Sequence, residues 1–174
     1  MKKESGFTLV ELLVSMAIVG VLSTIAVPEF QSYKSKAYNA RAEAAVYSLK
    51  AALSTVYHES DEANIGGSAW TNFSYRIPKT GLATTQGAGH DSDVAVTDFY
   101  DFDSPGARDM YIWAGANKSI SNDEIEIRVI HCQGSKLYIF TQSIIHENQI
   151  LRVFEKGQPG FPGVVFNFYI NNYC

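Results

Sequence analysis

The apolar residues of this chain are concentrated in one long run near its N-terminal end. Residues 7–27 contain a single ionisable side chain, that of Glu11. A helix of this length spans about 31 Å, which matches the hydrocarbon core of a bilayer. The pattern therefore predicts a membrane-spanning helix. A charge inside such a helix costs about 2.5–3.5 kcal/mol on insertion scales, so Glu11 needs a partner.

The helix is expected to continue through residues 29–58 with a different pattern. Apolar or small residues recur there in steps of mostly three and four, at Phe30, Tyr33, Ala37, Ala40, Ala44, Tyr47, Ala51 and Val56. This spacing is typical of an amphipathic helix, and we expect the stripe to pack against the rest of the protein. Pro28 lacks an N–H group, which predicts a kink between the two halves.

After the helix, residues 59–93 are rich in Gly, Asn and Asp and are predicted to form a connecting loop. Residues 94–174 carry strand patterns. We expect strands at 124–129, 137–142, 150–155 and 164–170, a turn at 133–135, and an edge strand at 110–114. The predicted fold class is α+β, with one antiparallel sheet laid across the apolar stripe of the helix.

Composition limits what the protein does. A chain of 174 residues holds one compact domain beyond the N-terminal segment, and its net charge of −4 argues against a phosphate-binding surface as its main function. We therefore predict no specific nucleic-acid partner. The only cysteines, Cys132 and Cys174, suit a domain exported to an oxidising compartment and allow one disulfide.

Candidate catalytic and metal-binding residues are sparse. The four histidines are scattered, and neither a nucleophile motif nor a phosphate-binding glycine loop is present, so we predict no enzyme and no cofactor. The acidic stretch with Asp98, Asp101 and Asp103 fails as an EF-hand, since Pro105 and Ile112 occupy the fifth and twelfth positions. We predict no bound metal, although a looser calcium site near this stretch, using Asp91, Asp93 or Asp109, stays an alternative to a solvated acidic loop.

Three interpretations of the N-terminal end compete. Lys2 and Lys3 followed by an apolar run fit a secretory signal peptide cleaved after Ala26, or a plain membrane anchor. The third rests on Gly6 followed by the residues FTLVELL, which resembles the class III signal of type IV prepilins and pseudopilins. The short basic leader, the Gly-Phe junction and the glutamate four residues beyond the phenylalanine carry this resemblance, which covers about the first 35 residues.

The resemblance implies a series of expectations for this chain. A prepilin peptidase would cleave between Gly6 and Phe7 on the cytoplasmic side and N-methylate Phe7. Gly20 and Pro28 stand where many type IV pilins carry helix-weakening residues. The head would be the αβ-roll of that family, and Glu11 would pair with the terminal amine of a neighbouring subunit.

These expectations also give a domain organisation. The segments are a leader (1–6), a transmembrane and filament-core helix (7–28), an amphipathic head helix (29–58), a connecting loop (59–93) and a sheet with a C-terminal disulfide region (94–174). The exported head predicts a disulfide between Cys132 and Cys174, which many pilins carry at their C-terminal loop.

The resemblance implies a structural subunit of a type IV pilus, serving motility, adhesion or DNA uptake. It would sit in the inner membrane with its head in the periplasm, and then polymerise with itself into a surface filament through membrane assembly machinery. Two alternatives stay open: a type II secretion pseudopilin or minor pilin, and a membrane-anchored binding domain that never polymerises.

Overall fold

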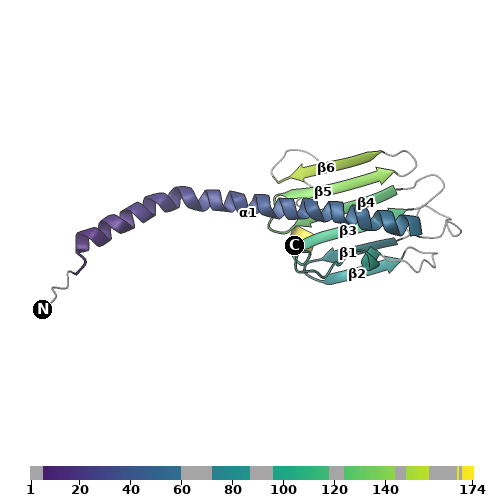
Figure 1. Ribbon diagram of the computed structural model, residues 1–174, viewed down its shortest axis with the longest axis horizontal. Helices are drawn as coiled ribbons and strands as arrows, with labels where there is room; N and C mark the ends of the chain where they lie inside the picture. Colours follow the sequence, from purple (N-terminus) through teal and green to yellow (C-terminus); the bar gives the residue numbers. More distant parts are fainter. Residues whose placement is uncertain are drawn as a thin grey trace.

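The fold is one long helix with a sheet packed along its C-terminal half. The computed structural model describes residues 6–59, 72–86, 96–117, 124–143, 148–156, 168 and 170–174. The helix is α1 (Leu9–Glu59), and its N-terminal half projects away from the head (Figure 1). The sheet contains β1 (Asn72–Ile77), β2 (Gly81–Gln86), β3 (Met110–Asn117), β4 (Glu124–His131), β5 (Lys136–Ser143) and β6 (Gln149–Glu155), and a short 3₁₀ helix, η2, covers Val96–Asp98. The α+β fold class is confirmed.

The strands lie in the order β2-β1-β3-β4-β5-β6, and each neighbouring pair is antiparallel. The strands predicted around β4, β5 and β6 are confirmed, and Gln133 lies in the turn that joins β4 to β5. In β4, buried Ile125 and Ile127 alternate with the only partly buried Glu124 and Glu126. This alternation is what a sheet with one face on a core requires.

The region expected to be a connecting loop instead contains the β1–β2 hairpin. The turn of this hairpin lies between Ile77 and Gly81. The Thr80 N–H donates to the Ile77 carbonyl, and Gly81 has a φ of 90°. The signal was hidden because the inward-facing residues of β1 include Ser74 and Arg76, which are buried polar groups. A strand is predicted from apolar residues at every second position, and polar residues at the buried positions of β1 break that pattern.

This hairpin also changes the place of β3. Residues 110–114 were expected at a sheet edge, but β1 pairs with β3 on one side and β4 pairs with it on the other. At the C-terminal end, the strand expected at 164–170 is not supported by the described residues. Phe168 and residues 170–173 are helical, while 164–167 and 169 lie outside the part of the chain that the structure describes.

The face that α1 turns to the sheet is the reverse of the predicted one. Of the predicted stripe, only Val56 is buried. The other seven residues are exposed, and we call them the outer stripe: Phe30, Tyr33, Ala37, Ala40, Ala44, Tyr47 and Ala51. The buried face consists of Asn39, Ala42, Ala45, Val46, Leu49, Ala52, Leu53, Val56 and Tyr57.

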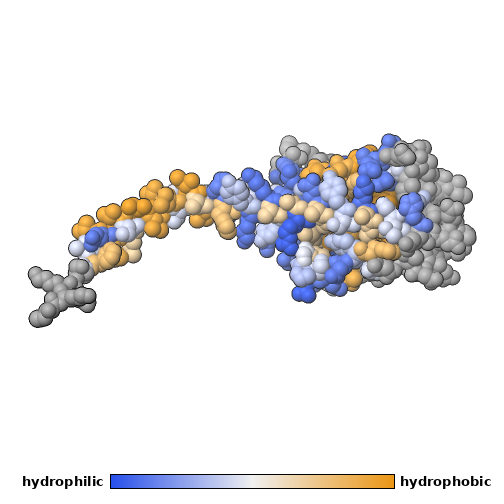
Figure 2. Space-filling view, in the orientation of Figure 1, coloured by the Kyte–Doolittle hydropathy of each residue, from blue (hydrophilic) through white to orange (hydrophobic). Residues whose placement is uncertain are grey.

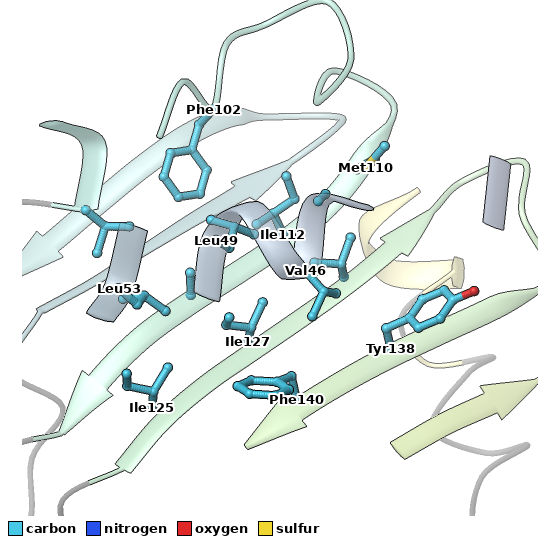
Figure 3. Close-up of a cluster of buried hydrophobic side chains, with 14 of the residues drawn as sticks. Val46, Leu49, Leu53, Phe102, Met110, Ile112, Ile125, Ile127, Tyr138 and Phe140 are labelled. Carbon is cyan, nitrogen blue, oxygen red and sulfur yellow. The ribbon is translucent and has the colours of Figure 1, made fainter. Parts of the chain in front are cut away.

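Side-chain volume explains this choice. The helix has two apolar faces, and the buried one carries larger aliphatic side chains such as Val46, Leu49 and Leu53. These fill the space above Ile112 and Ile127 of the sheet, as Figure 3 shows. A face made largely of alanine would leave voids there, and protein interiors are close-packed. We call the sheet face that α1 covers the inner face.

Substitution of one residue on each face of α1 tests this assignment. We expect Leu49→Ala to lower the free energy of unfolding by about 2–5 kcal/mol, because Leu49 is fully buried and its truncation leaves a cavity. Tyr47→Ala, on the outer stripe, should change it by less than about 0.5 kcal/mol. Denaturant unfolding of the full chain in detergent measures both. A larger loss from Tyr47→Ala than from Leu49→Ala would show that the faces are reversed.

Candidate functional site

The N-terminal half of α1 is an apolar helix on which no other described part of the chain packs. It contains a segment long and apolar enough to cross a membrane, and none of that segment is buried. Side chains such as Leu9, Ile18 and Ile25 are largely exposed. Figure 2 shows this half as a mostly hydrophobic surface, with a hydrophilic spot near its N-terminal end, that gives way to hydrophilic surface just before the head. In water such a surface is strongly unfavourable, so a bilayer or other protein must cover it.

The first turn of α1 is organised around Glu11. Gly6, Phe7 and Thr8 precede the helix, and Thr8 occupies the capping position. The Thr8 N–H and hydroxyl donate to Glu11 Oε2 at 2.9 Å and 2.7 Å, and the Glu11 N–H donates to Thr8 Oγ1 at 3.3 Å. This is a capping box, which satisfies helix N–H groups that have no partner within the helix.

Thr8 is a site residue that sequence analysis missed. Its signal was a threonine three residues before a glutamate at the start of an apolar run. The box consists of neutral donors around Glu11, and a cation is not among the partners found in the described part of the helix. Since the Gly6–Phe7 bond lies just outside the capped helix, cleavage there would leave the box intact.

The polar side chains deeper in the apolar half satisfy themselves locally. The hydroxyls of Ser15, Ser23 and Thr24 donate to backbone carbonyls three or four residues earlier, at 2.6–2.7 Å. They therefore expose no unpaired donor to hydrocarbon. Gly20 and Pro28 both lie inside α1, which remains one helix and curves along its N-terminal half (Figure 1). A localised kink at either residue stays a prediction.

Comparison with known proteins shows what this N-terminal region is similar to. Residues 1–27 match the family model "Prokaryotic N-terminal methylation motif". The chain is 35% identical over 101 residues to a fimbrial protein of Pseudomonas aeruginosa, covering 58% of this chain and 64% of that protein. It is 32% identical over 68 residues to the type IV major fimbrial protein FimA of Dichelobacter nodosus, covering 39% and 44%.

The chain is therefore similar to type IV pilins, in its N-terminal segment above all. A third relative, the type IV major alpha-pilin of Moraxella bovis, is 37% identical over 59 residues, covering 34% of this chain and 37% of the relative. The chain thus spans less than two thirds of the length of these relatives. No solved structure gives a significant match.

The C-terminal end of the head is held by a disulfide. Cys132, directly after β4, is bonded to Cys174, with the two Cα atoms 5.3 Å apart. Beside this bond Tyr173 stacks on Tyr111, with ring centroids 4.5 Å apart. Tyr173 and Ile170 pack on the sheet face opposite α1, against the cluster that contains Tyr111. The bond therefore fastens the chain end to the outer face of the sheet.

Asn39 joins α1 to the turn between β4 and β5. Its Oδ1 accepts hydrogen bonds from the backbone N–H groups of Ser135 (2.9 Å) and Lys136 (3.1 Å), and its Nδ2 donates to Ser135 Oγ at 2.9 Å. Gly134 belongs to the same contact, because a Cβ at that position would lie 2.7 Å from Asn39 Oδ1. These bonds fix the rotation of α1 about its own axis relative to the head.

His131 does not form a catalytic pair with the adjacent cysteine, since Cys132 is in the disulfide. The His131 ring is buried, stacks on Tyr38 at 4.3 Å between centroids, and accepts a hydrogen bond from the Gln133 N–H at Nδ1. Burial lowers the pKa of His131, and the charge of Arg41 lowers it further. The ring is a neutral packing element of the turn region.

In the described part of the acidic stretch, the carboxylates of Asp101 and Asp103 bind other groups of the same chain. Asp103 forms an ion pair with the buried Arg76, and Asp101 Oδ1 accepts the Asp103 N–H at 2.9 Å. Among the described residues, no group of three His, Cys, Asp or Glu side chains is placed to hold a metal ion. The Asp98 side chain, like Asp91 and Asp93, lies outside the described part.

Removal of the disulfide should destabilise the head without changing the helix. The bond closes a loop with a sequence separation of 42 residues. For a loop of that size the chain-entropy model gives about 4 kcal/mol, which is the loss we expect for the Cys132→Ser/Cys174→Ser double variant. Denaturant unfolding measures it. Reduction of the native chain should reproduce the loss, and an unchanged unfolding midpoint in the double variant would contradict the prediction.

Proposed function

We propose that this chain is a structural subunit of a type IV pilus, processed between Gly6 and Phe7, methylated at Phe7, and polymerised from the inner membrane into a surface filament. The observation that carries the proposal is the uncovered apolar half of α1, most of which lies within the residues that match the methylation-motif model (1–27). A bilayer covers this surface before assembly, and the same segments of other copies cover it afterwards.

The outer stripe supports polymerisation beyond the membrane segment. Within the head region it exposes Ala37, Ala40, Ala44 and Ala51 on the side of α1 that faces away from the sheet. Small side chains let helix backbones approach closely, which strengthens van der Waals packing between helices. The stripe extends the apolar half of α1, so helix–helix contacts between copies would run along much of α1.

The disulfide supports export of the head. Such bonds form and persist in oxidising compartments, including the bacterial periplasm and the cell surface. With residues 7–27 as the anchor, a head on the periplasmic side leaves the leader and its two lysines on the cytoplasmic side. That orientation presents the Gly6–Phe7 bond to a peptidase acting from the cytoplasmic side.

The mass of the mature protein tests the proposal directly. We expect the protein isolated from sheared filaments to lack residues 1–6, to begin at Phe7 and to carry one added methyl group. Intact-mass measurement and N-terminal sequencing decide it. A mature terminus at Val27 would indicate a secretory signal peptide, and full-length protein that stays in the membrane fraction would indicate a plain anchor.

Glu11 is proposed to pair with the positively charged amine that cleavage creates at Phe7 of a neighbouring copy. Its capping role and its charge are separable, because glutamine replaces glutamate in a capping box but carries no charge. We expect Glu11→Gln and Glu11→Ala to be inserted and processed but to yield at least about tenfold fewer filaments by electron microscopy, since a buried charge loses its counter-ion.

Thr8→Ala is the matched control, because it removes the hydroxyl of the box and keeps the Glu11 charge. We expect it to retain filaments. If Glu11→Gln assembled normally while Thr8→Ala did not, helix capping rather than charge pairing would be the function of Glu11.

A further inference from the structure

The strand β6 carries apolar side chains on the inner face of the sheet that α1 does not cover. Leu151 pairs with Phe140 and Val153 with Tyr138, two residues of the core, so Leu151 and Val153 lie on the same face as the core. The helix lies across β4 and reaches β3 and β5 (Figure 1). Leu151 and Val153 are therefore 37% and 40% exposed, whereas their partners are nearly fully buried.

Tyr47 of the outer stripe lies on the side of α1 that faces β6. This side is identified by Lys50, one helical turn further on, whose Nζ donates to Gln149 Oε1 of β6 at 2.9 Å and lies over the Phe140 ring. Tyr47 is 53% exposed. We call Tyr47, Leu151 and Val153 the β6 patch, and Figure 2 shows hydrophobic surface beside α1 along this edge of the head.

Polar groups border the β6 patch, and they are already paired within the chain. At one end, Lys50 binds Gln149; at the other, Lys136 forms an ion pair with Glu155 at 2.7 Å. The patch therefore combines an apolar centre with a border whose polar groups already have partners within the chain, and it does not call for a charged partner. Its complement is an apolar surface without charged side chains.

We infer that the β6 patch packs against the outer stripe of α1 from a second copy of this chain. The seven residues of the outer stripe are apolar or aromatic, carry no charge at neutral pH and are exposed, so they match the apolar centre of the patch. The patch and the stripe share Tyr47 and lie on one side of the head, so a neighbouring helix beside α1 covers both. This inference rests on the proposed polymerisation and adds a contact between head and helix to it.

One residue on each face of β6 tests the inference. Ile150 is 47% exposed, as accessible as Leu151, but its side chain lies on the opposite face of the sheet. We expect Leu151→Asp to be processed and to unfold near the native midpoint, yet to give at least tenfold fewer filaments. Ile150→Asp should give native numbers. Native filament numbers from Leu151→Asp, or equal losses from both variants, would overturn the inference.

Photo-crosslinking supplies a readout that holds even if Leu151→Asp misfolds. With p-benzoylphenylalanine at position 151, in filaments mixed from light and isotopically heavy full-length chains, we expect crosslinks between copies to peptides from residues 30–51. The same probe at position 150 should not reach them. Crosslinks from position 151 that exclude this segment would overturn the inference while native filaments leave the proposed function standing. Absence of filaments from the native chain would overturn both.

Discussion

The structure depends on the burial of one aliphatic face of α1 against β3 and β4. An antiparallel sheet with a bare apolar face is not stable in water, and neither is a helix with an exposed aliphatic face. Both apolar surfaces are buried together, because the side chains of α1 fill the space above the sheet: Val46, Leu49 and Leu53 pack on Ile112, Ile125 and Ile127. Because that face is committed to the head, the opposite face and the whole N-terminal half of α1 must find partners outside the chain. The proposed contacts between copies thus use the surfaces that the fold of the head leaves uncovered.

Burial alone does not define the direction in which the outer stripe points, since hydrophobic contacts are weakly directional. Directional bonds define it. Asn39 holds α1 against the β4–β5 turn through three hydrogen bonds. The disulfide from Cys132 ties the end of the chain to the other side of that same region. The outer stripe and the β6 patch are consequently presented as one rigid surface, which is what repeated contacts between identical copies require.

The N-terminal turn shows how one carboxylate serves two states. In the isolated chain Glu11 is held by Thr8 in a capping box, so it has hydrogen-bond donors before any neighbour arrives. In the proposed filament the amine of a neighbour adds the missing positive charge. A preformed orientation reduces the conformational entropy that pairing costs.

The parts of this protein that the sequence determined by itself are those encoded by contiguous residues. The apolar run of 7–27 and the junction at Gly6 and Phe7 predict the anchor and the family, and the alternation in β4 predicts a strand, because each signal is complete within a short segment. The Thr8–Glu11 box was equally local and readable.

Tertiary structure alone decided which apolar face of α1 is buried, that residues 72–86 form a hairpin, and that β3 is internal. Both faces of α1 satisfy the helical period, and only the volume available above the sheet favours Leu49 over Tyr47. Arg76 is tolerated inside β1 because Asp103, far away in sequence, pairs with it. Such choices depend on partners distant along the chain, and a local pattern does not contain them.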